Sequence, residues 1–255
     1  MKNKNRLLAA FLTLAFLIPL ARLSGQTSEP ATTPAPAVSP FKVTADLVSS
    51  YVWRGVLSTA TPTPNFQPTL AFDKGGLEIG AWGSTDFIGD YKEVDLYASY
   101  AIGPIKVTLT DYDWNFGPRY FNYKSKETGH IFEGSLGYSG PASFPISITA
   151  NVMFAGADKK WDETLGAVDP SKQAYSTYIE LGYAFKYFSP FLGVTPADGY
   201  YGDSYGGVNG FAVVNLGVSA SKNLKITDSF SLPLKATLGF NPQKEDAYLV
   251  FGITF

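Results

Sequence analysis

From Phe41 to the end of the chain, apolar and polar side chains alternate with a period of two residues in twelve segments. This is the period of a β-strand, whose successive side chains point to opposite faces of a sheet. Most segments have ten to fourteen residues, whereas strands of soluble sheets usually have about five or six. The expected strands cover residues 41–54, 65–73, 76–87, 91–102, 104–116, 130–139, 144–154, 174–187, 188–195, 209–221, 229–240 and 246–255. The pattern predicts an all-β fold.

The connections between these segments differ in length according to the end from which they leave. Long polar loops follow the first, fifth, seventh and ninth segments, whereas the connections at the other end are mostly tight or short. This segregation is typical of an outer-membrane barrel, in which the short turns are periplasmic. We therefore expect a single antiparallel transmembrane β-barrel of about 12 strands over residues 41–255. The sequence assigns no role to loops 117–130, 155–173 and 196–208.

One face of the expected strands is apolar and the other is polar or small. In residues 229–240, for example, Leu232, Leu234, Ala236 and Leu238 share one face, and Lys235 lies on the other. Val214, Leu216 and Val218 are likewise expected on the apolar face. A soluble barrel such as a lipocalin would turn the apolar face inward, and periodicity alone does not separate the two cases.

Aromatic residues on the apolar face favour the membrane, because lipid-exposed barrels carry aromatic girdles at both interfaces. The girdle at the short-turn end comprises Phe41, Phe72, Tyr100, Tyr138, Phe185, Phe230 and Phe255. The girdle at the long-loop end comprises Tyr51, Trp53, Phe66, Phe87, Trp114, Phe154 and Phe240. Keeping both Leu109 and Trp114 outside requires a bulge near Thr110 or Asp111.

The chain ends on the apolar strand "DAYLVFGITF". A barrel in lipid leaves no backbone edge unpaired, so the last strand must pair with the first. The terminal Phe255 also resembles the signal by which bacterial outer-membrane proteins are handed to their insertion machinery. That machinery is an expected partner.

The amino terminus is expected to be an export signal. Residues 1–25 hold a basic start, an apolar run and small residues, which is the pattern of a cleaved signal peptide, with a retained anchor as the alternative. Residues 26–40 form a linker rich in Pro, Thr and Ala. Removing residues 1–25 leaves 16 basic and 22 acidic residues, which argues against nucleic-acid binding. The chain has no Cys and therefore no disulfide framework.

Three stretches carry a resemblance to a known family. "VSSYVWRGVLS", followed by Gln67, "GGLEIGAWGSTDF" and "EVDLYASY", resembles the TorF-type porin family, also catalogued as Gcw_chp proteins. The match is densest over residues 43–100. The resemblance implies a bacterial outer-membrane barrel with a channel function, and it implies no substrate and no catalytic residue.

The polar face supplies the candidate pore-lining residues. They are Asp46, Arg54, Glu78, Trp82, Asp86, Glu93, Asp95, Tyr97, Glu133, Glu180 and Lys235. Joining residues 76–87 to 91–102 through a short turn places Asp86 opposite Glu93, Ser84 opposite Asp95 and Trp82 opposite Tyr97. Like charges paired in this way are unfavourable, so either a cation lies there or water solvates the groups. Trp82 and Tyr97 either stack on a sugar or nucleoside or fill the barrel.

Two features suggest other functions, and we expect neither. The sole histidine, His130, and Ser135 could serve a lipid hydrolase, but their spacing puts them on opposite faces of a strand and no orienting acid is evident. Asp198 and Asp203 flank glycines as in a calcium loop, but a mobile extracellular loop is the favoured interpretation. We expect no enzyme activity, no catalytic residue, no cofactor and no metal.

The predicted function is passive diffusion of small hydrophilic solutes through the bacterial outer membrane, in contact with its lipid and lipopolysaccharide. An excess of inward acids predicts a weak preference for cations. The alternatives are a non-conducting structural or ligand-binding barrel, closed by side chains or by loop 155–173, and a soluble periplasmic binding barrel. Neither the solute nor the oligomeric state follows from the sequence.

Overall fold

The computed structural model describes residues 39–114, 119–124, 126–162, 164–201, 210–228 and 230–255. The expected signal peptide and nearly all of the expected linker lie outside the described residues, and both stay predictions. The described residues include no helix long and apolar enough to cross a membrane.

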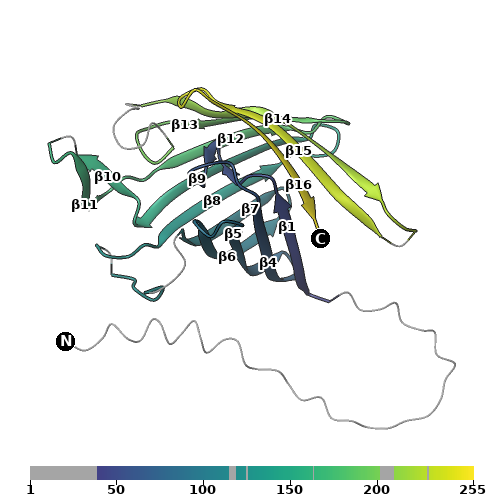
Figure 1. The fold of residues 1–255 in the computed structure, drawn as a ribbon, viewed down its shortest axis with the longest axis horizontal. Helices are drawn as coiled ribbons and strands as arrows, with labels where there is room; N and C mark the ends of the chain where they lie inside the picture. Colours follow the sequence, from purple (N-terminus) through teal and green to yellow (C-terminus); the bar gives the residue numbers. More distant parts are fainter. Residues whose placement is uncertain (1–38, 115–118, 125, 163, 202–209, 229) are drawn as a thin grey trace, which may run out of the picture. The chain divides into compact units, whose positions relative to one another are not determined.

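Twelve antiparallel strands form a closed barrel (Figure 1). They are β1 (Phe41–Val48), β4 (Asn65–Lys74), β5 (Leu77–Asp86), β6 (Lys92–Ile102), β7 (Ile105–Asp113), β8 (Ile131–Ser139), β9 (Ile146–Gly156), β12 (Thr177–Tyr183), β13 (Ser189–Thr195), β14 (Ala212–Lys225), β15 (Ser231–Asn241) and β16 (Asp246–Thr254). Each pairs with the strands before and after it in this series, and β16 closes onto β1. The predicted all-β barrel of 12 strands is confirmed.

Two short hairpins are not part of the barrel wall. The first joins β2 (Val52–Trp53) to β3 (Val56–Leu57), and the second joins β10 (Lys159–Asp162) to β11 (Ala167–Gln173). The predicted strand over residues 41–54 is therefore wrong beyond Val48. The expected apolar face resumes at Tyr51 and Trp53 with only Ser49 interrupting it, so the period of two does not reveal that the chain leaves the wall there.

The barrel is polar inside and apolar outside, which is the reverse of a soluble protein. Many large apolar side chains of the strands are exposed, among them Val43 at 77%, Leu109 at 57% and Leu249 at 57%. Many polar and charged side chains are buried inside, for example Asn65, Glu133 and Asn151. Exposing so much apolar surface to water is unfavourable, so this distribution fits a barrel whose outer face meets lipid.

The carboxyl-terminal strand closes the barrel, as expected. Phe255 and Ala45 exchange two backbone hydrogen bonds, of 2.9 and 3.3 Å, and the C-terminus lies beside β1 (Figure 1). The Phe255 side chain is 59% exposed on the outer face. Phe255 therefore contributes to closure through its backbone and to the outer surface through its ring.

We predict that deleting Phe255 lowers the amount of folded barrel, because both closing hydrogen bonds and one girdle ring are lost. The measurement is the yield of heat-modifiable protein in the outer-membrane fraction. Replacing Phe255 with Tyr retains the backbone bonds and the aromatic ring and serves as the control. A deletion variant with the full folded yield would contradict the assembly role of this residue.

The girdle at the short-turn end agrees with the structure better than the girdle at the other end does. Phe41, Tyr100, Phe185, Phe230 and Phe255 are all exposed. At the long-loop end, Phe66, Phe87, Phe154 and Phe240 are exposed as predicted.

Tyr51, Trp53 and Trp114 are corrections to the predicted girdle, because their rings pack inside the barrel. The Tyr51 hydroxyl and the Trp114 indole hydrogen-bond Glu93 in the lumen, a partner that lipid cannot offer.

The bulges also differ from the prediction. Strand β7 keeps a regular register with both neighbours and has no bulge at Thr110 or Asp111. Register shifts occur instead between Phe132 and Glu133 and between Gly193 and Val194. The second shift lies opposite Val214. This residue was expected on the outer apolar face, but it is fully buried.

Candidate functional site

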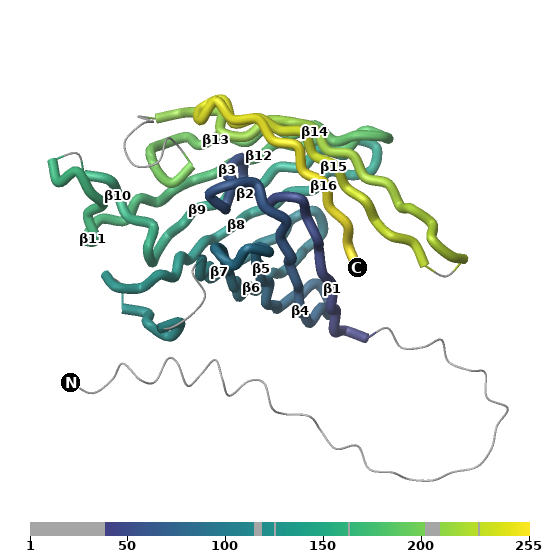
Figure 2. Tube along the Cα trace, viewed as in Figure 1, coloured from purple at the N-terminus to yellow at the C-terminus, as the bar shows by residue number. Residues whose placement is uncertain are grey.

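The segment between β1 and β4 folds into the lumen. In Figure 2 its dark blue trace turns away from the wall beyond β1 and carries β2 and β3. Trp53 pairs with Val56, so Arg54 and Gly55 form a two-residue turn, and both have positive φ angles of 52° and 81°. Such φ values suit the turn type that matches the twist of paired strands, and glycine adopts them freely. We call residues 52–57 the inner hairpin.

Gly55 is held tightly at the tip of the inner hairpin. A Cβ atom at this position would collide with the backbone oxygen of Val214 on β14. The Asn241 side chain on β15 donates a 3.1 Å hydrogen bond to the Gly55 carbonyl. The hairpin tip is therefore in direct contact with the barrel wall at β14 and β15.

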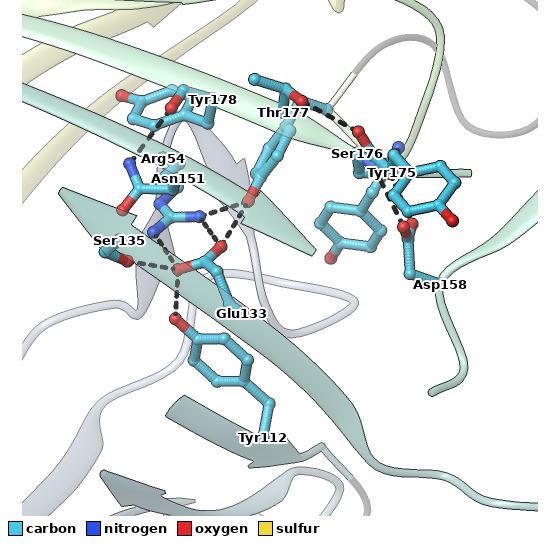
Figure 3. Close-up of polar contacts among 12 residues, drawn as sticks. Arg54, Tyr112, Glu133, Ser135, Asn151, Asp158, Tyr175, Ser176, Thr177 and Tyr178 are labelled. Carbon is cyan, nitrogen blue, oxygen red and sulfur yellow. Dashed lines mark hydrogen bonds and ion pairs between the residues drawn. The ribbon is translucent and has the colours of Figure 1, made fainter. Parts of the chain in front are cut away.

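Arg54 connects the inner hairpin to the other side of the lumen (Figure 3). Its guanidinium donates two hydrogen bonds, of 2.6 and 2.8 Å, to the Glu133 carboxylate on β8. It also hydrogen-bonds the Tyr201 hydroxyl, and the Tyr112 hydroxyl donates to Glu133 at 2.9 Å. The Glu133 side chain is 1% exposed and that of Arg54 is 13% exposed. The pair is bidentate and buried, which is the strongest geometry for these groups.

Aromatic rings surround this ion pair. The Arg54 guanidinium lies 4.4 Å from the centroid of Trp53 and 5.1 Å from that of Tyr178. Trp53 in turn contacts the rings of Trp114 and Tyr201 at 5.7 and 5.6 Å. Cation–π contacts favour a guanidinium in such a setting. The ion pair and these rings occupy the lumen on the long-loop side of the inner hairpin.

On the short-turn side of the inner hairpin the lumen is hollow. A cavity of about 600 Å³ lies between the hairpin and the turns of β8–β9 and β12–β13. Its wall combines hydroxyl and amide side chains with apolar and aromatic ones, and its polar residues include Arg54, Gln67, Glu180, Asn215, Lys235 and Tyr248. A cavity of this size and polarity can hold water or a small polar solute.

The predicted pore-lining residues lie in two groups inside the barrel. Arg54, Glu180 and Lys235 line the cavity. The others lie within the wall's polar face, where several are already bonded. Asp46 accepts a bond from Thr254 at 2.5 Å, and Glu93 accepts one from Tyr91 at 2.7 Å.

The predicted pairing between β5 and β6 is wrong by two residues. Ser84 pairs with Glu93, Trp82 with Asp95, and Gly80 with Tyr97. Asp86 instead stabilises the turn, because it accepts hydrogen bonds from the backbone of Gly89 and Tyr91 at 2.7 and 3.3 Å.

No pair of acids therefore faces across this hairpin, and the argument for a cation between Asp86 and Glu93 is lost. Tyr97 covers Gly80, where a Cβ atom would meet its ring at 2.6 Å. The ring of Trp82 contacts Tyr51 at 5.5 Å. Trp82 and Tyr97 do not form a paired stacking surface.

Glu93 and Asp95 lie beneath the segment that leaves β1. Both are at most 6% exposed. Burial raises the pKa of the Tyr51 hydroxyl, which faces Glu93 from this segment and stays protonated as a donor. These acids are covered by Tyr51 and Tyr91 and do not line an open mouth. The sequence could not show this, because it depends on the inward turn at Ser49.

His130 is held by an acid that the sequence did not reveal. Its Nδ1 atom lies 2.7 Å from Asp111 Oδ1, and its Nε2 atom donates to the backbone oxygen of Tyr120. Ser135 hydrogen-bonds Glu133 in the lumen, at the opposite face of β8. Both ring nitrogens are occupied, and the described part of the chain places no serine hydroxyl on either. His130 therefore attaches the loop of residues 119–124 to the wall.

The described parts of loops 155–173 and 196–208 form no metal site. Asp198 accepts a 2.7 Å bond from the Gly210 backbone, and Asp203 lies outside the described residues. Within the described ranges no group of His, Cys, Asp and Glu could hold a metal ion. Loop 155–173 contains the β10–β11 hairpin, and none of its described residues lines the cavity. The inner hairpin, not this loop, enters the lumen.

Comparison with known proteins adds little to this description. The fold is similar to that of Salmonella typhi OmpF in complex with daunomycin, with 8% identity and a TM-score of 0.36, over 84% of this chain and 97% of that chain. We base no argument about function on a similarity of this size. No protein-family model and no curated protein matches the chain. The resemblance to the TorF-type family therefore stays a prediction.

Several residues at the inner hairpin were not predicted from the sequence. Tyr112, Tyr201 and Asn241 bind Arg54, Glu133 or Gly55 from three separate parts of the chain. The only signal was the dipeptide Arg54–Gly55 between β-branched and aromatic residues, which is a possible two-residue hairpin.

Proposed function

We propose that this chain is a bacterial outer-membrane barrel that lets small hydrophilic solutes diffuse through a narrow lumen. The observation that carries the proposal is the inverted polarity of the wall, with exposed apolar side chains outside and buried polar ones inside. A closed barrel satisfies its backbone hydrogen bonds without water, as a membrane requires. The contacts with lipid and lipopolysaccharide follow from this location, and the TorF-type resemblance is consistent with it.

The inner hairpin is the proposed constriction. The cavity of about 600 Å³ ends at residues 50–54, and the Arg54–Glu133 pair lies beyond it. Charged groups at a narrow point of a pore select which solutes pass. A lumen of this form admits water and small ions and excludes larger solutes.

A second candidate is a non-conducting barrel that binds a ligand or a partner. The specific observation in its favour is that Arg54 bridges the lumen and is enclosed by Trp53 and Tyr178. In that case the cavity is a pocket that opens only at the short-turn end.

Single-channel recording of the purified protein in a planar lipid bilayer separates the two candidates. The proposal predicts small ohmic conductance steps, and their absence from a folded, heat-modifiable preparation would support the non-conducting barrel. Reversal potentials in a salt gradient then test selectivity. We expect a weak cation preference that decreases in Glu180→Gln, because this acid lines the lumen cavity. Anion preference of the unmodified protein would contradict this proposal.

A further inference from the structure

The junction that closes the barrel covers only part of β16. Asp46, Leu47 and Val48 pair with Thr254, Ile253 and Gly252. The next contact towards the long-loop end is a 2.8 Å hydrogen bond from the Ser49 backbone N–H to the Phe251 carbonyl, and it is the last one between the two strands. Beyond Ser49 the chain turns into the lumen, so residues 246–250 of β16 pair with β15 alone. We call this unpaired side of β16 the seam.

The seam lies at the height of the apolar belt. In an antiparallel strand alternate residues direct both backbone groups to the same neighbour, and Phe251 and Phe255 bond towards β1. Ala247 and Leu249 therefore direct their backbone groups to the seam, and no bond to them from that side exists among the described residues. Leu249 pairs with Leu238, below the girdle residue Phe240. Unpaired backbone groups are costly in lipid, so the seam needs water or a polar partner.

The lumen cavity lies directly behind the seam. Tyr248 and Val250, on the inner face of β16, line it together with Ser50 and Gly252. The hydroxyl of Ser50 is buried and has no hydrogen-bond partner. On the outer face Leu249 and Phe251 are 57% and 56% exposed. One strand edge therefore separates the lipid-facing surface from a polar cavity.

A free cation lies at the lower end of the seam. Lys235 lines the cavity and pairs with Gly252, the last β16 residue that also pairs with β1. Within the described ranges Lys235 takes part in no ion pair, whereas Lys42 and Arg54 are both paired. A free ammonium group beside a route to lipid suits an anionic headgroup.

We propose that the seam is a lateral portal through which a single-chain anionic amphiphile enters the cavity. Its carboxylate binds Lys235, and its hydrocarbon chain leaves between Leu249 and the residues that follow Val48. The cavity of about 600 Å³ lies within the range of small-molecule sites. This activity goes beyond diffusion of hydrophilic solutes, because it needs no passage beyond the inner hairpin.

The binding half of the proposal is tested by titrating dansyl-labelled undecanoate into the protein in lipid vesicles. We expect saturable binding that Lys235→Gln weakens about tenfold, since one charge-assisted hydrogen bond is lost. Lys222→Gln is the control, because Lys222 pairs with Leu234 and lies on the opposite face from Lys235. Equal affinities of the Lys235→Gln and Lys222→Gln variants would overturn the assignment of the headgroup.

The portal itself is tested with single cysteine variants, which can be labelled specifically because the chain contains no cysteine. Val250→Cys, labelled with bimane, is compared in ordinary vesicles and in vesicles of chain-brominated phosphatidylcholine. We expect quenching close to that of the lipid-facing Leu249→Cys, and little quenching of Ser147→Cys, which lines the same cavity on β9. Quenching of Val250→Cys as weak as that of Ser147→Cys would overturn the portal. Neither result depends on whether the lumen conducts.

Discussion

Leu234→Arg should destabilise the barrel by up to about 4 kcal/mol, because a charge on the lipid face costs about 2 to 4 kcal/mol at mid-bilayer and less towards the interfaces. Leu234 lies on the outer face of β15 and pairs with Ile253 of the closing strand. The measurement is the free energy of unfolding from reversible urea denaturation in lipid vesicles. The matched control is the next residue, Lys235→Glu, which places a charge in the cavity.

Lys235→Glu should change stability much less than Leu234→Arg and should alter selectivity instead. The two substitutions differ by one position along the strand, so secondary-structure propensity and depth are nearly equal. Equal destabilisation by both variants would show that the faces have been assigned wrongly.

Arg54→Ala should cost about 3 to 5 kcal/mol, because it leaves the Glu133 carboxylate buried without its counter-ion. The control is Lys42→Ala, which removes the ion pair with Asp73. The side chains of Lys42 and Asp73 are 54% and 33% exposed, so water screens that pair and its loss should change stability far less. Both costs are measured as the free energy of unfolding in vesicles.

The double variant Arg54→Met with Glu133→Gln should recover part of the cost of Arg54→Ala, because it leaves no unpaired charge in the lumen. An Arg54→Ala variant no less stable than Lys42→Ala would mean that the inner hairpin is not held by this ion pair.

The barrel itself could be predicted from the sequence because its determinants are local. A period of two, short turns at one end and exposed rings such as Phe41 and Phe240 all follow from the order of residues along single strands. Even the strand over residues 188–195, which is short and contains Pro190, is present as β13. Pairing of the last strand with the first follows from the requirement for a closed backbone.

The interior could not be predicted because its determinants are distant in the chain. Arg54 and Glu133 are separated by 79 residues, and Arg54 and Tyr201 by 147. Nothing in the alternation near Ser49 indicates that the chain leaves the wall. The same inward turn moves Tyr51 and Trp53 from the expected girdle into the lumen. The register error between β5 and β6 has a local cause, since Asp86 was counted as part of the pairing and instead stabilises the turn.

The inner hairpin is the proposed narrowest part of the polar lumen, and one conductance measurement tests this directly. Val48 and Asn65 are paired neighbours on β1 and β4, so residues 50–63 can be replaced by a four-residue turn of Gly, Asn and Ser, while Ser49 and Pro64 keep their backbone hydrogen bonds to Phe251 and Phe87. In a planar bilayer we expect single-channel conductance several-fold above that of the unmodified protein. Unchanged conductance of the folded variant would contradict the account.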